Sequence, residues 1–377
     1  MGVFALLASL VVLAVAPGQA AASSQLQAGL YDEASTLFAS DTQGFDTLQE
    51  LGIDVLRLNL YWDRVASTRP ANGADPADPA YDWSLYDRAV DLSKARNIKL
   101  LLSIIATPGW ANGGKGAKFA PTKMSDLQAF ARAAATRYSG TYVPAGAAAA
   151  LGQVVWWGAW NEPNAPNFLQ PQSRKVGNRY VFVSPGIYAK ICNAIYAGVH
   201  AAGAANGVGE TVACGATNPR GKLRGNGNRD SVSPLLFLQG MKAAGARFDV
   251  YSHQPYSPTR HLAPNERTAS KTVIPLGNIN TLIRELTRLY GRQMKLWITE
   301  YGYQTNPPDP LFGVSWTTQA NYLRQAFAIA RKNPRIDMML WFLLRDEVDV
   351  GRWQSGVISA SGQRKPSFAA LQDVAGG

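Results

Sequence analysis

The chain has few of the side chains from which metal sites are built. Among 377 residues there are three histidines and two cysteines, and no cluster of Cys or Asp ligands accompanies them. The sequence therefore predicts no structural or catalytic metal, and we expect no cofactor. The cysteines, Cys192 and Cys214, fall in a helical pattern and in the strand pattern that follows it. Both a disulfide and two buried thiols remain open for this pair.

Charged residues are also scarce, at 17% of the chain, although their balance is basic. Lys and Arg number 37 against 26 Asp and Glu, which gives a net charge of +11. The basic residues are dispersed, and no run of them alternates with aromatics as in a nucleic-acid site. We therefore expect no nucleic-acid partner, and interpret the charge as a solvated surface with weak affinity for anionic cell-wall material.

Long apolar runs are missing beyond the first residues, since no later segment reaches the ~18 apolar residues of a membrane span. Residues 4–16 form an apolar run too short to cross a bilayer, and small residues follow it. This pattern predicts a secretory signal over residues 1–22. For the rest of the chain, residues 23–377, we expect a single domain. We expect a secreted monomer without stable membrane association. Because no Lys or Arg precedes the apolar run, a misplaced start or an uncleaved anchor remains open.

Strand-like and helix-like patterns alternate eight times along the rest of the chain. Most of the strand candidates are continuous runs of Val, Ile, Leu and Trp, which is typical of strands covered on both faces. They occupy residues 26–31, 55–61, 99–106, 154–160, 211–216, 248–252, 295–299 and 338–344.

Amphipathic stretches with helical spacing lie between these strands, and Asn or Gly follows several of them as a helix C-terminal signal. They include residues 83–96, 125–138, 185–202, 233–244, 279–290, 317–332 and 365–373. Eight alternations predict an α/β fold, the closed (β/α)8 TIM barrel. A doubly wound open sheet is the alternative, although no Gly-rich phosphate loop follows the first strand.

Irregular segments rich in Pro and Gly fall after the strands rather than before them. Long loops gathered on one face of a barrel build a cleft, so we expect a groove suited to an extended substrate. These loops cover residues 68–79, 108–121, 164–184, 217–230, 256–277 and 304–315.

Two glutamates lie where strand-like runs end. Glu162 falls within residues 154–164 (VVWWGAWNEPN) and Glu300 within residues 295–303 (KLWITEYGY). Barrel enzymes keep their chemistry at the carboxyl ends of strands. Apolar walls suit a general acid at Glu162, and nearby donors suit an ionised nucleophile at Glu300. A buried structural glutamate is the alternative at each position, but two inward carboxylates are the minimal machinery for glycosidic cleavage.

With these motifs the chain resembles clan A of the glycoside hydrolases, the retaining (β/α)8 glycosidases that include families 5 and 39. The resemblance extends over the sequence that follows the apolar run. It implies that Glu162, in Asn-Glu-Pro at the end of the fourth strand, is the acid/base. It also implies that Glu300, at the end of the seventh strand, is the nucleophile, and that Asn161 holds the sugar 2-hydroxyl.

The same resemblance assigns several substrate-binding residues. It implies that Arg57 on the second strand lies near the nucleophile and that Trp341 on the eighth strand lies under the reacting sugar. At the end of the sixth strand, Tyr256 matches the tyrosine that bonds the nucleophile. Alignment on the following proline puts Gln254 where a histidine is usual, so His253 is a substrate-binding candidate with a shifted position.

Aromatic residues near strand ends can stack on the apolar faces of sugar rings. Four follow strand-like runs: Trp62, Trp110, Tyr303 and Trp353. Trp110 is the preferred candidate, because its loop is otherwise small and polar. Ordinary core packing is the alternative for each.

The function predicted from these features is that of a secreted retaining glycoside hydrolase that cleaves β-glycosidic bonds by double displacement. Its partner would be a poly- or oligosaccharide, with cellulose-, mannan- and xylan-directed activities all open. Two alternatives are a non-catalytic carbohydrate-binding barrel and a transglycosylase that remodels envelope glycan.

Overall fold

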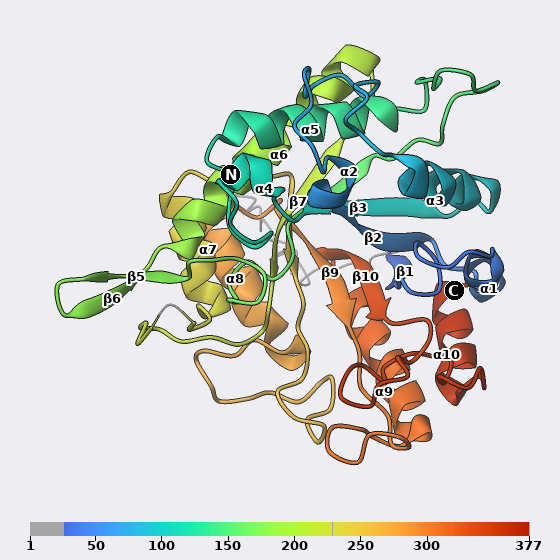
Figure 1. Cartoon of the computed structure of the whole chain (residues 1–377). Helices are drawn as coiled ribbons and strands as arrows, with labels where there is room; N and C mark the ends of the chain where they lie inside the picture. Colours follow the sequence, from blue (N-terminus) through green and yellow to red (C-terminus); the bar gives the residue numbers. More distant parts are fainter. Residues whose placement is uncertain (1–25, 228, 377) are drawn as a thin grey trace, which may run out of the picture.

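The computed structural model describes residues 26–227 and 229–376, and eight parallel strands close into a barrel within them (Figure 1). The strands follow one another around the barrel in the order β1-β10-β9-β8-β7-β4-β3-β2. The predicted (β/α)8 barrel is therefore confirmed, and the signal predicted over residues 1–22 lies outside the described residues. The barrel strands are β1 (Gln27–Tyr31), β2 (Val55–Tyr61), β3 (Lys99–Ile105), β4 (Trp156–Ala159), β7 (Thr211–Thr217), β8 (Val250–His253), β9 (Lys295–Tyr301) and β10 (Ile336–Phe342).

The strands are buried along nearly their whole length because helices cover their outer face and side chains fill the barrel. In β2, for example, the first six residues are buried. Successive side chains of a strand point to opposite faces, so an apolar run can supply both layers. A separate cluster of buried side chains from several strands packs together: Val55, Leu101, Ala213, Val250, Trp297, Met338 and Leu340. This packed layer makes the barrel a solid support for the loops above it.

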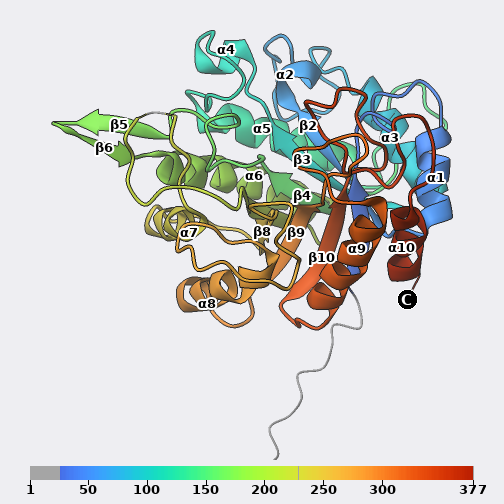
Figure 2. The same ribbon diagram turned by 90° about the horizontal axis from the view of Figure 1, so that it is seen from below.

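Helices surround the barrel, and their buried faces follow the helical spacing of the sequence (Figures 1 and 2). In α8 the residues Ile279, Leu282, Ile283 and Leu286 are buried at intervals of three and four. The longer helices are α1 (Gln43–Leu51), α3 (Ser84–Ala95), α5 (Met124–Arg137), α6 (Ser184–Asn206), α7 (Pro234–Ala243), α8 (Ile279–Tyr290), α9 (Trp316–Arg331) and α10 (Pro366–Ala375). Three short turns, α2 (Trp62–Val65), α4 (Gly109–Asn112) and η1 (Leu276–Asn278), lie in loops after strands.

Residues 164–184 depart from the sequence prediction, since they contain a hairpin as well as loop. Helix α1 also lies outside the predicted helical stretches. Strands β5 (Ser173–Val176) and β6 (Arg179–Phe182) pair antiparallel and project from the body of the molecule (Figure 2). Gly177 makes the turn with a left-handed φ of 57°. The hairpin is short and mostly exposed, so it lacks the apolar pattern on which the strand prediction depended.

A disulfide joins α6 to β7 and decides between the two alternatives for the cysteines. Cys192 and Cys214 are bonded at an S–S distance of 2.09 Å, and both are fully buried. The bond ties an outer helix to the strand that follows it.

Among the helices of the described residues, none combines the length and hydropathy needed to cross a bilayer.

Candidate active site

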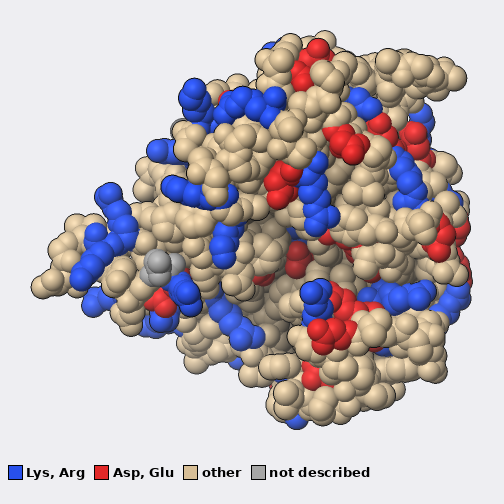
Figure 3. Space-filling view, viewed as in Figure 1, with Lys and Arg blue, Asp and Glu red and all other residues tan. Residues whose placement is uncertain are grey.

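A cavity of about 790 Å³ opens at the carboxyl ends of the barrel strands, between the long loops. Both Glu162 and Glu300 line it, so barrel closure brings together two carboxylates that are far apart in the sequence. In Figure 3 the surface is hollowed near the centre of the view, and acidic side chains are visible in the hollow. The expected cleft of long βα loops is therefore present.

Glu300 is held by three donors, Arg57 on β2 and two residues of the segment that follows β8. The Arg57 Nη1 atom lies 2.6 Å from its Oε1 in a buried ion pair, and the Gln254 Nε2 atom donates to the same oxygen at 3.0 Å. The Tyr256 hydroxyl donates to Oε2 at 2.9 Å. The guanidinium balances the charge of the carboxylate, and the three bonds fix its direction. A carboxylate so oriented is suited to attack a carbon atom above it.

Arg57 and Gln254 also fix Asn161, whose side chain is buried on the cavity wall. Arg57 Nη2 donates to the Asn161 Oδ1 atom at 2.8 Å, and Gln254 Nε2 donates to it at 2.7 Å. With its oxygen engaged twice, Asn161 keeps its NH₂ group as the donor for the cavity. The geometry fits the predicted contact of Asn161 with a substrate hydroxyl.

Glu162 lies just after β4 in a different environment. Its backbone has a left-handed φ of 36°, which is unfavourable for a residue with a side chain and is typical of functional sites. Burial, and next the negative charge of Glu300, raise the pKa of Glu162 to about 8. Opposing influences come from Asn218, Arg57 and Arg220. Glu162 is therefore mainly protonated at neutral pH, as a general acid must be.

Asn218 is a site residue that the sequence analysis missed. Its Nδ2 atom lies 3.0 Å from each carboxyl oxygen of Glu162. Asn164 aligns it, by accepting a hydrogen bond from the Asn218 backbone N–H at 2.8 Å and donating to its carbonyl at 3.0 Å. The available signal was an amide two residues after the strand-like run 211–216, followed by proline.

The aromatic residue of β10 at the cavity is Phe342 rather than the predicted Trp341. Trp341 is fully buried, and its indole N–H donates to the Ser355 carbonyl at 2.9 Å. Phe342 lines the cavity and packs against Tyr31 and Trp353, with ring centroids 5.1 and 5.2 Å away. Neighbouring residues of a strand point to opposite faces, so a shift of one residue exchanges a core role for a site role.

The predicted substrate-binding residue His253 lies away from the cavity wall. His253 is fully buried, and its ring nitrogens bond to the Thr217 hydroxyl at 2.8 Å and the Ile274 carbonyl at 2.9 Å. Burial lowers the pKa of His253 to about 4, so the ring is neutral and structural. Gln254 occupies the position beside Glu300 instead.

The indole of Trp110 is engaged with protein rather than facing the cavity. Its N–H donates to the Ala66 carbonyl at 2.7 Å, and its ring packs edge-on against Trp62, which is itself fully buried. Both residues have a packing role. Of the four aromatic candidates, Tyr303 and Trp353 line the cavity.

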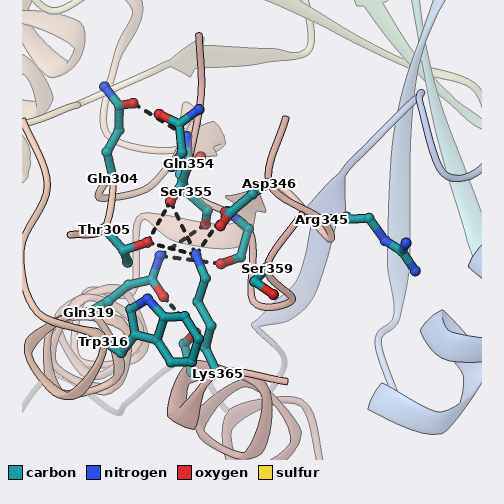
Figure 4. A network of polar contacts seen from close by, with 12 residues as sticks. Gln304, Thr305, Trp316, Gln319, Arg345, Asp346, Gln354, Ser355, Ser359 and Lys365 are labelled. Atoms are coloured by element: carbon teal, nitrogen blue, oxygen red, sulfur yellow. Dashed lines mark hydrogen bonds and ion pairs between the residues drawn. The ribbon is translucent and has the colours of Figure 1, made fainter. Parts of the chain in front are cut away.

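A buried lysine contacts both of the loops that carry Tyr303 and Trp353 (Figure 4). Lys365, at the start of α10, pairs with Asp346 at 2.7 Å. It also donates to the Thr305 hydroxyl at 2.8 Å and the Gln354 carbonyl at 3.2 Å. These partners belong to the loops after β9 and β10, so one charged group ties both loops to the last helix.

Among the described residues, no group of three His, Cys, Asp or Glu side chains is arranged to hold a metal ion.

A scan against protein-family models finds no match for this chain, and a search of curated proteins finds none either.

Several solved structures resemble this chain. A family 39 glycoside hydrolase from Bacteroides cellulosilyticus matches with a TM-score of 0.64 at 18% identity, over 93% of this chain and 63% of that one. A glucosidase from Croceicoccus marinus matches with a TM-score of 0.66 at 13% identity, over 95% and 69% of the two chains. A monomeric β-xylosidase from Caulobacter crescentus matches with a TM-score of 0.58 at 18% identity, over 95% and 69%.

The chain shares the (β/α)8 barrel fold with these glycoside hydrolases. At these identities the similarity establishes the fold, and activity has to be argued from the site. The chain spans about 63% of the length of the family 39 relative.

Proposed function

We propose that this protein is a secreted retaining glycoside hydrolase that cleaves β-glycosidic bonds by double displacement. The observation that carries the proposal is the unequal setting of two carboxylates in one cavity. Glu162 has a pKa raised to about 8 by burial and by the charge of Glu300. Glu300 accepts three hydrogen bonds, one of them from a buried guanidinium. Two carboxyl groups in such different environments suit an acid and a nucleophile.

In the first step Glu300 attacks the anomeric carbon while Glu162 gives its proton to the departing glycosidic oxygen. A covalent glycosyl-enzyme forms as the bond to the leaving sugar breaks. In the second step water attacks the same carbon, Glu162 takes up the water proton, and the bond to Glu300 breaks. Asn161 donates to the 2-hydroxyl, and Tyr256 keeps Glu300 aligned through both steps.

The proposed substrate is a poly- or oligosaccharide, since the cavity is open and carries Tyr303, Phe342 and Trp353 as surfaces for sugar rings. Secretion is supported by the signal pattern of residues 1–22 and by the Cys192–Cys214 disulfide, which suits an oxidising compartment. We propose a monomer, the state named for the xylosidase relative.

Mechanism-based labelling tests the proposal. A panel of 2-fluoro glycosides should label the protein with one sugar per chain, and peptide mapping should find the label on Glu300. Glu300→Gln should abolish labelling and hydrolysis. Glu285→Gln, a change on the outer helix α8, should leave both intact. No labelling across the panel, together with saturable binding of the same sugars, would instead indicate a carbohydrate-binding barrel.

Product analysis then distinguishes hydrolysis from transfer. The proposed hydrolase releases reducing sugars, with retained configuration at the new anomeric centre in the first minutes of reaction. Longer oligosaccharides that accumulate in place of free sugar would show that a sugar, rather than water, accepts the glycosyl group.

A further inference from the structure

The charges around the cavity are unevenly distributed. Among the described residues that line it, the only carboxylates are Glu162 and Glu300, whereas three cations reach the wall: Lys118, Arg220 and Arg260. Arg57 is buried against Glu300 below and neutralises that carboxylate. Apart from the two glutamates, the described lining residues therefore include no carboxylate that could balance these three cations.

All three cations lie in the same half of the barrel as Glu162. Lys118 follows β3, Glu162 follows β4, Arg220 follows β7 and Arg260 follows β8, and these four strands are consecutive around the barrel. Among the described lining residues, the other half, above β9, β10, β1 and β2, contributes uncharged side chains apart from Glu300, including the aromatic rings of Tyr303, Phe342 and Trp353.

None of the three cations forms an ion pair within the described part of the chain. Arg220 donates through Nη2 to the carbonyls of Ser257 at 3.2 Å and Pro258 at 3.0 Å. These bonds orient the side chain, and its Nε and Nη1 groups have no hydrogen-bond acceptor among the described residues. Its charge reaches Glu162, whose pKa it lowers. Arg260 donates to the Pro310 carbonyl, and Lys118 is exposed.

The surface view agrees with this asymmetry. In Figure 3 the side of the hollow that carries the β5–β6 hairpin shows mainly Lys and Arg, whereas the opposite side mixes both signs. Unpaired cations along one half of a cleft attract an anionic group there and give a neutral one no such advantage.

We propose that the half of the cleft beside Glu162 binds a sugar that carries an anionic group, the carboxylate of a uronic acid or a sulfate ester. This inference rests on the proposed function, because a general acid stands next to the bond that it protonates and the departing sugar therefore lies on its side. Lys118 and Arg220 contact the anionic group of the leaving part, and the uncharged aromatic half holds the sugar that is transferred to Glu300. The substrate class is thus an acidic glycan.

Binding measured with the Glu300→Gln protein tests the inference without turnover. Oligosaccharides that contain glucuronate or galacturonate are compared with their carboxyl-reduced forms, and sulfated oligosaccharides with their desulfated forms. The acidic member of one pair should bind about tenfold more tightly at low salt, and added NaCl should remove the advantage. The pair that shows the difference identifies the anionic group.

Charge-removing variants locate the effect. In the Glu300→Gln background, Lys118→Gln with Arg220→Gln should weaken binding of the acidic ligand about tenfold and change binding of the neutral ligand less than about twofold. Lys190→Gln on the outer helix α6, which removes an exposed charge far from the cavity, should change neither. Thermal unfolding of each variant verifies that the fold is intact.

Equal binding of acidic and neutralised ligands, or an acidic preference that survives loss of both cations, overturns the inference. Either result leaves the proposed function untouched if the native protein is labelled at Glu300 and cleaves neutral glycans. Conversely, cation-dependent binding of acidic ligands without labelling or cleavage supports the anion site and contradicts the proposed catalysis.

Discussion

Glu162 can work as a proton donor because its surroundings oppose ionisation, and the largest influence that limits this opposition is the hydrogen bond from the Asn218 amide. Burial and the neighbouring Glu300 raise its pKa to about 8, whereas Asn218 donates to both of its oxygens and lowers it. A donor stabilises the charged form of a carboxyl group, so Asn218 keeps the pKa within the range in which Glu162 can both give and regain a proton.

Replacing Asn218 with Ala should therefore raise the pKa of Glu162 further. Loss of activity at alkaline pH reports deprotonation of the acid, so the alkaline limb of the kcat/KM profile, near pH 8 in the native protein, should move up by about one pH unit. Asn167→Ala removes another amide from the cavity lining, one without a bond to Glu162, and should leave the limb in place. A limb that stays put or moves down in the Asn218 variant would show that the amide does not tune this carboxyl.

At the scale of elements, the two loops that carry Tyr303 and Trp353 depend on the buried pair of Lys365 and Asp346 (Figure 4). Both side chains are essentially inaccessible, with exposed fractions of 0% and 1%. Burial raises the pKa of Asp346 and lowers that of Lys365, and each partner counteracts the shift of the other. Breaking such a pair leaves one uncompensated charge inside the protein.

Lys365→Met should lower the free energy of unfolding by about 3 to 5 kcal/mol, because Asp346 is left buried without its partner. The double variant Lys365→Met with Asp346→Leu should recover much of that loss. For comparison, Arg324→Met breaks an exposed pair with Asp373 and should cost less than about 1 kcal/mol. Urea denaturation measures all three, and equal losses in the single and double variants would contradict a cost that arises from the unpaired charge.

At the scale of the whole molecule, pH should affect the stability of the barrel through Glu210. This buried carboxyl precedes β7 and accepts a hydrogen bond from the Trp157 indole at 2.7 Å. Burial raises the pKa of Glu210 to about 7, from 4.5 in an exposed chain. Between these values the folded protein binds more protons than the unfolded one, so this group favours folding below pH 4.5 and loses that contribution as pH rises through 7.

Glu210→Gln should make the protein more stable at pH 7 to 8, by roughly 1 to 3 kcal/mol, and change stability little at pH 4.5. The reason is that glutamine keeps an acceptor for Trp157 and carries no charge to bury. Glu50→Gln, at an exposed glutamate, serves as the control. Denaturation at a series of pH values measures the free energy of unfolding of each protein. If the Glu210→Gln variant loses as much stability between pH 4.5 and pH 8 as the native protein does, the assignment is refuted.

The sequence by itself determined the barrel and the location of its two carboxylates. Eight apolar runs, each followed by a helical pattern, predict strands that must be buried on both faces, and Glu162 and Glu300 stand at the ends of two of them. These are local properties, since strand burial and helix amphipathicity depend on residues a few positions apart. The short β5–β6 hairpin escaped because it is mostly exposed, and helix α1 was not among the helical stretches identified.

The resemblance already pointed to Arg57, Asn161 and Tyr256, whereas only the tertiary structure decided between adjacent candidates for the other positions of the site. Gln254 rather than His253 reaches Glu300, and Phe342 rather than Trp341 reaches the cavity, because adjacent residues of a strand point to opposite faces and a one-residue shift reverses them. Asn218 meets Glu162 across 56 positions, and Lys118, Arg220 and Arg260 share one half of the cleft only after the barrel closes. Such contacts depend on how the chain returns on itself, which no local pattern in the sequence encodes.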